Sequence, residues 1–501
     1  MGLPMAESLR EGNRFEAKLA KGGVPASMWE TYSAFANTEG GTIVLGASEK
    51  PSGQVELVGV DDPESLVKKI WDAVNNPSKV SANVLASGDV RIADMDGCRV
   101  VVIDVPRASR QLRPVYVGKQ REKGTFRRNG EGDYHCSSEE IVAMVRDASP
   151  APLDAAVLEE FSLEALSQET VVRFRASVEA VRPHHPWLSL SFEELLVRLN
   201  AAGRVNGEGP LHPTRAGLLM FGFEYEIVRE YPEFFLDYRQ VGEGTRWDDR
   251  MTSQDGAWSG NVFDFWLQCL PRLVAGIKRP FALGESLQRI EDTDMHAAAR
   301  ELFVNALVHA DYYGRRGVVA LRFHDRIEVA NPGTSRVALD AMVAGGVSDA
   351  RNPTMMKMFS LINACERAGS GFDVMRSAAR TSGARPPEAK ELLNPDRIVV
   401  SLFLGDAAVD DFATKEGRTG YREGADSFRN SADSLPEISS VSEEGRILER
   451  ANGQGFVTRK DVEQLLGCGP TKAKGLIGGL VKRGVLKPEG SARSTRYRIV
   501  G

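Results

Sequence analysis

Apolar and polar residues follow a helical period in several parts of the chain, most clearly in the stretch ELFVNALVHADYYG. Glu301, Asn305 and His309 recur at every fourth position, so on an α-helix they form one narrow polar stripe. Leu302 and Phe303 fall on the side that would face a core. The pattern predicts a largely buried helix that carries a carboxylate, an amide and an imidazole in a line.

Within residues 1–150 the pattern changes from helix to strand and back. Apolar residues at helical spacing predict a helix over 28–37, and GGTIVLGASE predicts a short strand entered through two glycines. VRIADMDGCRVVVIDVP predicts a β-hairpin that turns at Asp96 and Gly97, a pair that favours such turns. SSEEIVAMVRDAS has the polar and acidic start typical of a helix. These elements predict an α/β domain that ends at the proline-marked SPAPLD.

Two further segments follow this domain. Residues 151–405 combine helical stretches with GVVALRFHDRIEVANPG, which predicts two strands joined at His324 and Asp325. Residues 406–442 are rich in Asp, Gly, Ser and Arg and poor in large apolar side chains, which predicts a flexible linker. With a final domain after the linker, the expected fold class is a multidomain α+β protein.

Residues 443–501 have the pattern of a winged helix-turn-helix. EEGRILERA predicts a first amphipathic helix, and TRKDVEQLLG predicts a short second helix capped by Thr458. Pro470 stands at the first position of a third helix, where proline is well tolerated. VLKPEGSARSTRYRIV then predicts the two strands of a β-wing. In such a domain the last helix is the one that enters the major groove of DNA.

Charge along the chain favours a polyanionic partner for this tail. The final segment carries 12 Lys and Arg against 6 Asp and Glu, a net of +6, whereas the whole chain carries −6, which leaves −12 for the rest. Thr471, Lys472 and Lys474 would stand at the exposed start of the third helix, and Arg496 on the wing could reach phosphates. We therefore expect the tail to bind nucleic acid, with a protein-binding winged helix as the alternative.

The remaining bulk properties exclude several classes of protein. The length of 501 residues suits about three domains. No apolar run approaches the roughly 20 residues that cross a bilayer, and the first residues lack the apolar stretch of a secretory signal. The five cysteines contain no C-x-x-C pair, so neither a disulfide framework nor a zinc site is predicted. We expect a cytoplasmic protein with no membrane partner.

Four motifs lie close together in the second half of the chain: E-x-x-x-N-x-x-x-H-x-D-Y, N-P-G, R-N-P and G-S-G. Together they resemble the ATP-binding C-terminal domain of RecG-like, Schlafen-related bacterial proteins, a degenerate relative of the GHKL ATPases. The resemblance covers about 211–404. It implies a GHKL-like α/β sandwich for 151–405, with ATP and Mg²⁺ as cofactors.

The resemblance also implies roles for individual residues. Asn305 would hold Mg²⁺ against the triphosphate, and Glu301 would orient the attacking water. An amide oxygen is a hard ligand that suits Mg²⁺, and glycines let backbone N–H groups approach phosphates. The other implied nucleotide-site residues are Asn331, Gly333, Gly369, Ser370 and Gly371.

Asn331 departs from the family pattern, because the wider GHKL group has an aspartate at the adenine-binding position. An amide can still accept a hydrogen bond from the adenine amine. Binding of ATP is therefore better supported than selectivity for adenine or hydrolysis of ATP. His309 receives no role from the resemblance. A lone histidine on a helix is more often packed than metal-bound, and neither H-E-x-x-H nor a G-x-x-x-x-G-K-[ST] phosphate loop occurs. Neither a zinc site nor a helicase motor is therefore predicted.

The strings EGNRFEAKLA and SAFANTEGGTIVLG resemble the Schlafen AlbA-type domain, over about 11–147. In nuclease-active Schlafens, two glutamates and a third acid form a metal-dependent triad that cleaves RNA. Glu11 and Glu16 match the pair, Glu49 is the best third candidate, and Lys18 would hold the scissile phosphate. Carboxylates grouped in this way bind Mg²⁺ or Mn²⁺, which activates water.

A basic run with interleaved aromatic residues, RQLRPVYVGKQREKGTFRR, follows in the same domain. It suits a nucleic-acid groove that would include Arg127 and Arg128, or else an exposed basic hairpin without that role.

Three hypotheses follow from these patterns. The first is a nucleotide-gated, nucleic-acid-binding protein, either a transcriptional regulator or a defence factor. The second is a divalent-metal-dependent nuclease that acts on RNA, such as tRNA, or on DNA in anti-phage defence. The third is a scaffold whose sites are inactive. Winged helices and GHKL domains often dimerise, so a homodimer or larger homo-oligomer is a further hypothesis.

Overall fold

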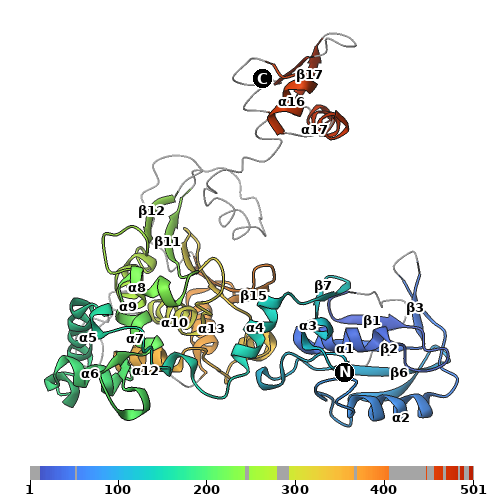
Figure 1. Ribbon diagram of the computed structural model, residues 1–501, viewed down its shortest axis with the longest axis horizontal. Coiled ribbons are helices and arrows are strands. Elements are labelled where there is room, and N and C mark those ends of the chain that lie inside the picture. Colours follow the sequence, from blue (N-terminus) through green and yellow to red (C-terminus); the bar gives the residue numbers. More distant parts are fainter. Residues whose placement is uncertain are drawn as a thin grey trace. The chain divides into compact units, whose positions relative to one another are not determined.

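The chain divides into two compact units, Met1–Glu416 and Gly417–Gly501, each with helices and strands (Figure 1). This confirms the predicted mixture of α and β structure in a multidomain chain. The predicted linker, 406–442, lies outside the described residues, and the predicted domain boundaries stay predictions. No helix in the described part of the chain is long and apolar enough to span a membrane. The computed structural model describes residues 12–50, 54–242, 247–278, 293–365, 369–405, 447, 456–466, 470–482, 486–489 and 496–499.

A four-stranded sheet with the order β1-β2-β6-β5 forms the centre of the N-terminal part. Side chains alternate between its faces, so Ile43 and Ile103 point to one core while Val44 and Val102 point to another. Helices α1 and α2 contribute to the first core, and the β3–β4 hairpin contributes to the second. The elements are β1 (Phe15–Lys18), α1 (Ser27–Asn37), β2 (Gly41–Leu45), β3 (Ala47–Glu49), β4 (Val55–Leu57), α2 (Pro63–Val74), β5 (Val90–Met95) and β6 (Cys98–Val105).

Two predictions for this part are confirmed. Strands β5 and β6 pair antiparallel, and the turn residues Asp96 and Gly97 have φ of 51° and 78°, as the tightest hairpin turns require. The predicted closing helix is α4 (Ser138–Asp147), which begins with a capping box between Ser137 and Glu140. Between them lie α3 (Arg121–Gly124) and the paired strands β7 (Phe126–Asn129) and β8 (Gly132–His135).

The rest of the first unit combines a helical part with a six-stranded sheet. Before the first strand of the sheet come α5 (Gln168–Val181), α6 (Phe192–Leu199), β9 (Ala202–Gly203), β10 (His212–Pro213), α7 (Arg215–Phe221) and α8 (Glu224–Glu230). Helix α9 (Val262–Leu273) follows the first two strands. The sheet has the order β12-β11-β13-β14-β16-β15, and only the β11–β13 pair is parallel. Its strands are β11 (Leu236–Val241), β12 (Trp247–Thr252), β13 (Val318–Arg322), β14 (Arg326–Pro332), β15 (Glu388–Leu392) and β16 (Arg397–Phe403).

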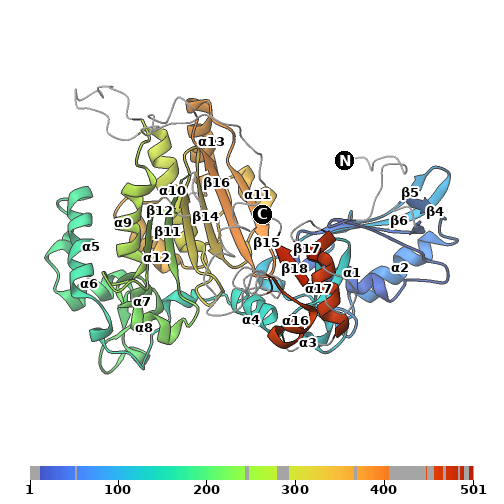
Figure 2. The same ribbon diagram turned by 90° about the horizontal axis from the view of Figure 1, so that it is seen from above.

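Helices α10 (Asp294–His309) and α13 (Gly371–Ser382) lie side by side against this sheet, as Figure 2 shows. Leu302, Phe303 and Leu307 of α10 are buried in the large core, whereas Asn305 and His309 are only partly buried. The apolar and polar sides of α10 thus agree with the predicted helix. Strands β13 and β14 confirm the predicted strand pair. The shorter helices are α11 (Leu339–Ala344) and α12 (Pro353–Leu361).

In the described part of the second unit, α16 and α17 are followed by a two-stranded antiparallel sheet. The elements are α16 (Arg459–Leu466), α17 (Pro470–Lys482), β17 (Leu486–Glu489) and β18 (Arg496–Ile499). The hydroxyl of Thr458 accepts a hydrogen bond from the Asp461 N–H at 3.3 Å, which confirms the predicted cap. The predicted first helix lies outside the described residues apart from Ile447, which is helical and buried.

Candidate functional site

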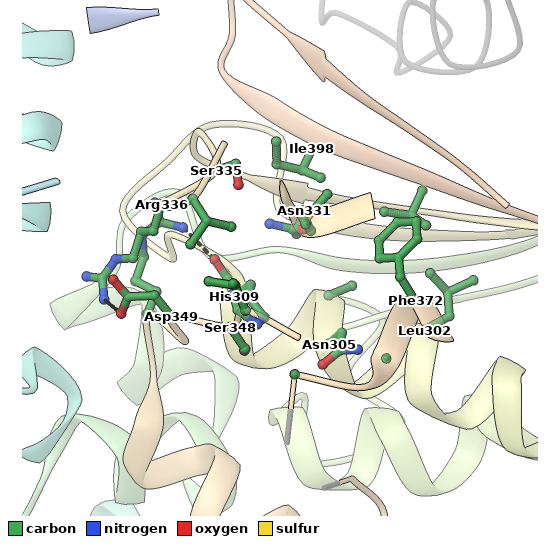
Figure 3. Close-up of a pocket in the computed structure, with 18 of the residues that line it drawn as sticks. Leu302, Asn305, His309, Asn331, Ser335, Arg336, Ser348, Asp349, Phe372 and Ile398 are labelled. Atoms are coloured by element: carbon green, nitrogen blue, oxygen red, sulfur yellow. Dashed lines mark hydrogen bonds and ion pairs between the residues drawn. The ribbon is translucent and has the colours of Figure 1, made fainter. Parts of the chain in front are cut away.

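The polar stripe of α10 forms one wall of a cavity of about 90 Å³. The opposite wall comes from β14 and β16, and α13 closes the side. We call it the asparagine cavity, because Asn305 of α10 and Asn331 of β14 face it from two walls (Figure 3). Predicted site residues that are far apart in the sequence therefore meet in one place. Those that line it are Glu301, Asn305, Asn331, Gly369 and Gly371.

The asparagine cavity has an apolar end and a charged end. Figure 3 shows Leu302 and Phe372 at one end and the Arg336–Asp349 pair at the other. The Arg336 Nη1 and Asp349 Oδ1 atoms are 3.6 Å apart. A ligand that combines a flat apolar ring with an anionic group matches this distribution of side chains.

Glycines allow close packing beside the polar stripe. The Asn305 side-chain N–H donates to Glu301 Oε1 at 3.2 Å, and a Cβ at position 371 would lie 2.5 Å from the same Asn305 nitrogen. Gly369 has φ of +68°, and a Cβ there would lie 2.9 Å from the backbone of Gly346. Any larger residue at either position would displace its neighbours. The G-S-G motif is therefore explained by packing against the candidate site.

Two of the predicted nucleotide-site residues do not line the asparagine cavity. Ser370 is the N-cap residue of α13. Gly333, with φ of +95°, packs against Asp311 and Arg351 and lines a second cavity. Asn331 itself is 4% exposed, and its side-chain N–H donates to the carbonyl of Pro332 at 3.3 Å. The part of the N-P-G motif that faces the asparagine cavity is thus its asparagine.

His309 lies at the charged end of the asparagine cavity. Burial lowers the pKa of its imidazole to about 4, and the positive charges of Arg351 and Arg336 act in the same direction. His309 is therefore neutral at neutral pH. Its backbone carbonyl accepts a hydrogen bond from Arg351, so the end of α10 is fixed from outside the helix.

Asp147, at the end of α4, holds the two arginines that face this cavity. Its Oδ1 accepts from Arg351 Nε at 2.8 Å and from Arg336 Nη2 at 3.0 Å, and its Oδ2 accepts from Arg351 Nη2 at 2.7 Å. Burial acts to raise the pKa of Asp147, but Arg351 and then Arg336 outweigh it and hold that pKa well below its usual range. Asp147 is therefore ionised, and its two carboxylate oxygens form a bidentate contact with Arg351.

Sequence reasoning missed this group. The signal was present in the R-N-P motif, of which Arg351 is the first residue. Asn352, the second, donates to the carbonyls of Val308 and Ala310 at the end of α10, at 3.2 and 2.8 Å. Pro353 begins α12. The motif thus joins α4, α10 and α12.

In the N-terminal part, Glu16 and Lys18 are neighbours on β1. Lys18 Nζ is 2.8 Å from Glu16 Oε1, and Arg128 Nη2 is 2.7 Å from Glu16 Oε2. Glu49 is exposed at the end of β3, and Glu11 lies outside the described residues. Within the described part of the chain, no three His, Cys, Asp or Glu side chains are grouped to hold a metal ion. The predicted metal triad therefore stays a prediction.

The predicted role of Arg127 and Arg128 in nucleic-acid binding does not fit their surroundings. The two residues are 5% and 2% exposed. Arg127 Nη1 lies 2.8 Å from Asp396 and 2.9 Å from Glu140, while Arg128 pairs with Glu16 and with Asp133 at 3.0 Å. The sequence pattern revealed their charge but not the acids that neutralise it, of which Glu16 and Asp396 come from distant parts of the chain.

In the second unit, Lys474 of α17 and Arg496 of β18 are exposed. The Arg496 guanidinium carbon lies 4.4 Å from the ring centre of Phe456, a cation–π contact. The side chains of Thr471 and Lys472 lie outside the described residues, so only their place at the start of α17 can be given.

Comparison with protein families supports two of the predicted resemblances. Residues 11–137 match the family model described as "Schlafen, AlbA_2". Residues 317–400 match the one described as "Putative ATP-dependent DNA helicase recG C-terminal", and 142–237 match a domain of unknown function. Asn331, Gly333, Gly369 and Gly371 fall inside the second match, whereas Glu301 and Asn305 precede it. The matches indicate a nucleic-acid-related, ATP-associated function.

No curated protein matches the chain. Among solved structures, the DIP2311 protein from Corynebacterium diphtheriae is similar at 17% identity and a TM-score of 0.39, over 97% of this chain and 92% of that one. The N-terminal domain of a "Putative ATP-dependent DNA Helicase RecG-related Protein" from Nitrosomonas europaea is similar at 25% identity and a TM-score of 0.21. That match covers 27% of this chain and 95% of the other.

We predict that His309 makes stability depend on pH. Between its unfolded pKa of 6.5 and its folded pKa of about 4, the unfolded chain binds more protons, so the free energy of unfolding falls as the pH falls through this window. One proton accounts for at most about 1.4 kcal/mol per pH unit. In urea denaturation from pH 7 to pH 4, His309→Gln should show a smaller pH slope than the wild type. His324→Gln, at an exposed histidine, is the control; equal slopes for His309→Gln and the wild type would contradict the prediction.

Proposed function

We propose that this protein binds nucleic acid and that ATP with Mg²⁺, bound in the asparagine cavity, regulates this binding. The observation that carries the proposal is the meeting of Glu301, Asn305, Asn331 and the two motif glycines in one cavity of mixed polarity. The family match over 317–400 supports the same site. A GHKL-like sandwich would account for the arrangement of α10 and α13 on the sheet.

The residues of the asparagine cavity suit the parts of a nucleotide. The apolar end, with Leu302 and Phe372, would take the adenine ring beside Asn331, whose amide can accept a hydrogen bond from the adenine amine. The glycines around the start of α13 would lie near the phosphates, where backbone N–H groups can bind oxygens. At about 90 Å³ the asparagine cavity is smaller than the usual 300–1,000 Å³ of ligand sites, so its wall would have to move for a whole nucleotide to enter.

The fit of Mg²⁺ can be judged from the donor atoms. Asn305 and Glu301 are hydrogen-bonded to each other and supply hard oxygen ligands from one helix face. Mg²⁺ usually keeps several waters and takes the rest of its ligands from phosphates, so two protein side chains suffice. When bound, the ion would neutralise phosphate charge. Glu301 would orient a water, and hydrolysis is the less secure part of the proposal, because Asn331 replaces the usual aspartate.

The regulation rests on buried ion pairs that join residues 107–147 to residues 336–396. Arg107 Nη1 lies 2.9 Å from Glu391 Oε2, and both side chains are 6% exposed. Arg127 reaches Asp396, and Asp147 reaches the arginines of the asparagine cavity. Since a ligand can shift an equilibrium only through different contacts in two states, Arg336 and Arg351 are the residues through which ATP would act on α4.

The nucleic-acid contact is proposed for the second unit as a winged helix. Exposed Lys474 and Arg496 support it, together with the net charge of +6, from 12 basic and 6 acidic residues, in the final segment. The alternative, a Schlafen-type nuclease, has weaker support because Glu16 is already held by Lys18 and Arg128. Cleavage of RNA with Mn²⁺ that Glu16→Gln abolishes would favour this alternative.

We predict that Asn305→Ala weakens the binding of ATP with Mg²⁺ about tenfold or more, because it removes both an ion ligand and the partner of Glu301. Isothermal titration calorimetry on the full chain measures this. Asn129→Ala, at an exposed asparagine of β7, is the matched control and should bind like the wild type. Absence of heat with the wild-type protein would reject ATP as the ligand.

We predict that the double variant Lys472→Ala/Lys474→Ala binds DNA or RNA more weakly. Its affinity should also depend less on salt, because about two fewer counterions are released on binding. Fluorescence anisotropy at several salt concentrations measures both quantities. Lys68→Ala/Lys69→Ala removes the same charge from exposed positions of α2 and is the control. Unchanged affinity at all salt concentrations would show that the tail does not bind nucleic acid.

We predict that ATP changes the affinity of the wild type for nucleic acid by about five- to 100-fold and that Asp147→Asn loses this effect. Asp147→Asn should still bind ATP, because Asp147 acts on the arginines and not on the ligand. Asp340→Asn is the control, since it breaks an exposed ion pair with Arg14. An ATP effect of equal size in Asp147→Asn would exclude this route of regulation.

A further inference from the structure

Arg113 is a buried cation without an acidic partner. It is 4% exposed, and no carboxylate of the described residues lies within ion-pair distance of it. Its one hydrogen bond runs from Nη2 to the Ser335 carbonyl at 3.5 Å, and its Nε has no partner among the described atoms. The same carbonyl already accepts from Arg107 at 2.6 Å. Such a group costs stability, since its charge has no carboxylate in direct contact and its Nε–H has no acceptor among the described atoms.

The energetic state of Arg113 agrees with this geometry. Burial, and then the positive charge of Arg107, lower the pKa of Arg113 to about 9. The guanidinium is thus still charged at neutral pH. By contrast, burial of Arg127 is outweighed by Asp396, which raises the pKa of Arg127 above its ordinary value. The two arginines differ because Arg127 is paired directly with carboxylates, whereas Asp147 and Glu391 act on Arg113 only from beyond ion-pair distance.

Arg113 lines a second cavity, of about 630 Å³, which we call the arginine cavity. It lies between α4, the 311–316 loop and the 394–396 loop. Its volume is within the range of small-molecule sites, and it is distinct from the asparagine cavity, with which it shares Thr334 and Arg351. Its lining arginines are Arg113, Arg127, Arg146, Arg315, Arg316 and Arg351.

Charge pairing in the arginine cavity leaves Arg113 without a carboxylate at ion-pair distance. Each of the five lining acids has an arginine within ion-pair distance. These acids are Glu139, Glu140, Asp147, Asp311 and Asp396. Six arginines against five acids give a net of +1. The five pairs use four of the arginines, because Arg127 holds both Glu140 and Asp396, and Arg113 is a buried arginine that takes part in none of them. An anionic ligand would supply what Arg113 lacks.

We propose that the arginine cavity binds a small phosphate monoester, with Arg113 as the buried residue that pairs with its phosphate. A guanidinium presents N–H donors in a planar fork that matches two phosphate oxygens. The cavity volume of about 630 Å³ suits a molecule of the size of a sugar phosphate or a mononucleotide. A nucleic-acid strand would need an open groove, whereas Arg113 is 4% exposed.

Calorimetry on the full chain with ribose 5-phosphate, ribose and inorganic phosphate tests the proposal. Ribose 5-phosphate should bind the wild type, inorganic phosphate more weakly, and ribose not measurably. Arg113→Gln should weaken ribose 5-phosphate binding about 10- to 100-fold, because a hydrogen bond to a charged group is lost. Arg121→Gln, at an exposed arginine paired with Glu122 outside the arginine cavity, is the charge-matched control.

Thermal denaturation gives an independent reading. Ribose 5-phosphate should raise the Tm of the wild type and not that of Arg113→Gln, and without ligand the Tm of Arg113→Gln should equal or exceed that of the wild type. Equal affinity of both proteins for ribose 5-phosphate would overturn the proposal. Binding of ribose 5-phosphate that depends on Asn305 but not on Arg113 would also overturn it. A protein that binds an oligonucleotide through Arg113 but does not bind ribose 5-phosphate would overturn it too.

If Arg113→Gln does not fold, Arg113→Lys is the variant that tests the proposal. It keeps the charge but loses the planar fork, so the affinity for ribose 5-phosphate should fall several-fold. An unchanged affinity in Arg113→Lys would also overturn the proposal.

Discussion

The bidentate pairing of Asp147 with Arg351, with Arg336 on the same carboxylate, is the interaction on which the arrangement of the first unit depends most. All three side chains are largely withdrawn from water, so each charge relies on the others for stabilisation. Through Arg351 the network reaches the carbonyl at the end of α10, and through Asp147 it reaches the end of α4. Loss of one member would leave its partners buried and uncompensated, which is more costly than loss of a surface pair.

This network joins the candidate nucleotide site to the N-terminal part and would be the route of the proposed regulation. The walls of the asparagine cavity are elements of a single core, which transmit displacement because they are closely packed. The charged end of the asparagine cavity is different, since its arginines are held by a carboxylate from another segment. A ligand bound there would contact Arg336 and Arg351, whose shared carboxylate partner, Asp147, belongs to α4.

Much of the fold could be predicted from the pattern of the chain. The helix with Glu301 and Asn305, the Asp96-Gly97 hairpin and the capped helices at Ser137 and Thr458 depend on local rules of period, turn and cap. The glycines at 369 and 371 could be placed near the polar stripe only through a family resemblance. The partners of Arg127 and Arg128 could not be predicted, because a basic run looks the same whether water or distant acids surround it. Ion pairs between residues more than 200 positions apart, such as Asp147 with Arg351, leave no local signal.

Arg351 is a member of both cavity walls. Its guanidinium has five N–H donors. Those of Nε and Nη2 already serve Asp147 and the Thr334 carbonyl, and Nη1 serves the His309 carbonyl. Two anionic ligands would therefore compete for one side chain. Occupancy of one cavity would lower the affinity of the other, and by thermodynamic reciprocity the antagonism would be equal in both directions. The occupancy of the two cavities would then depend on the ratio of the concentrations of two metabolites.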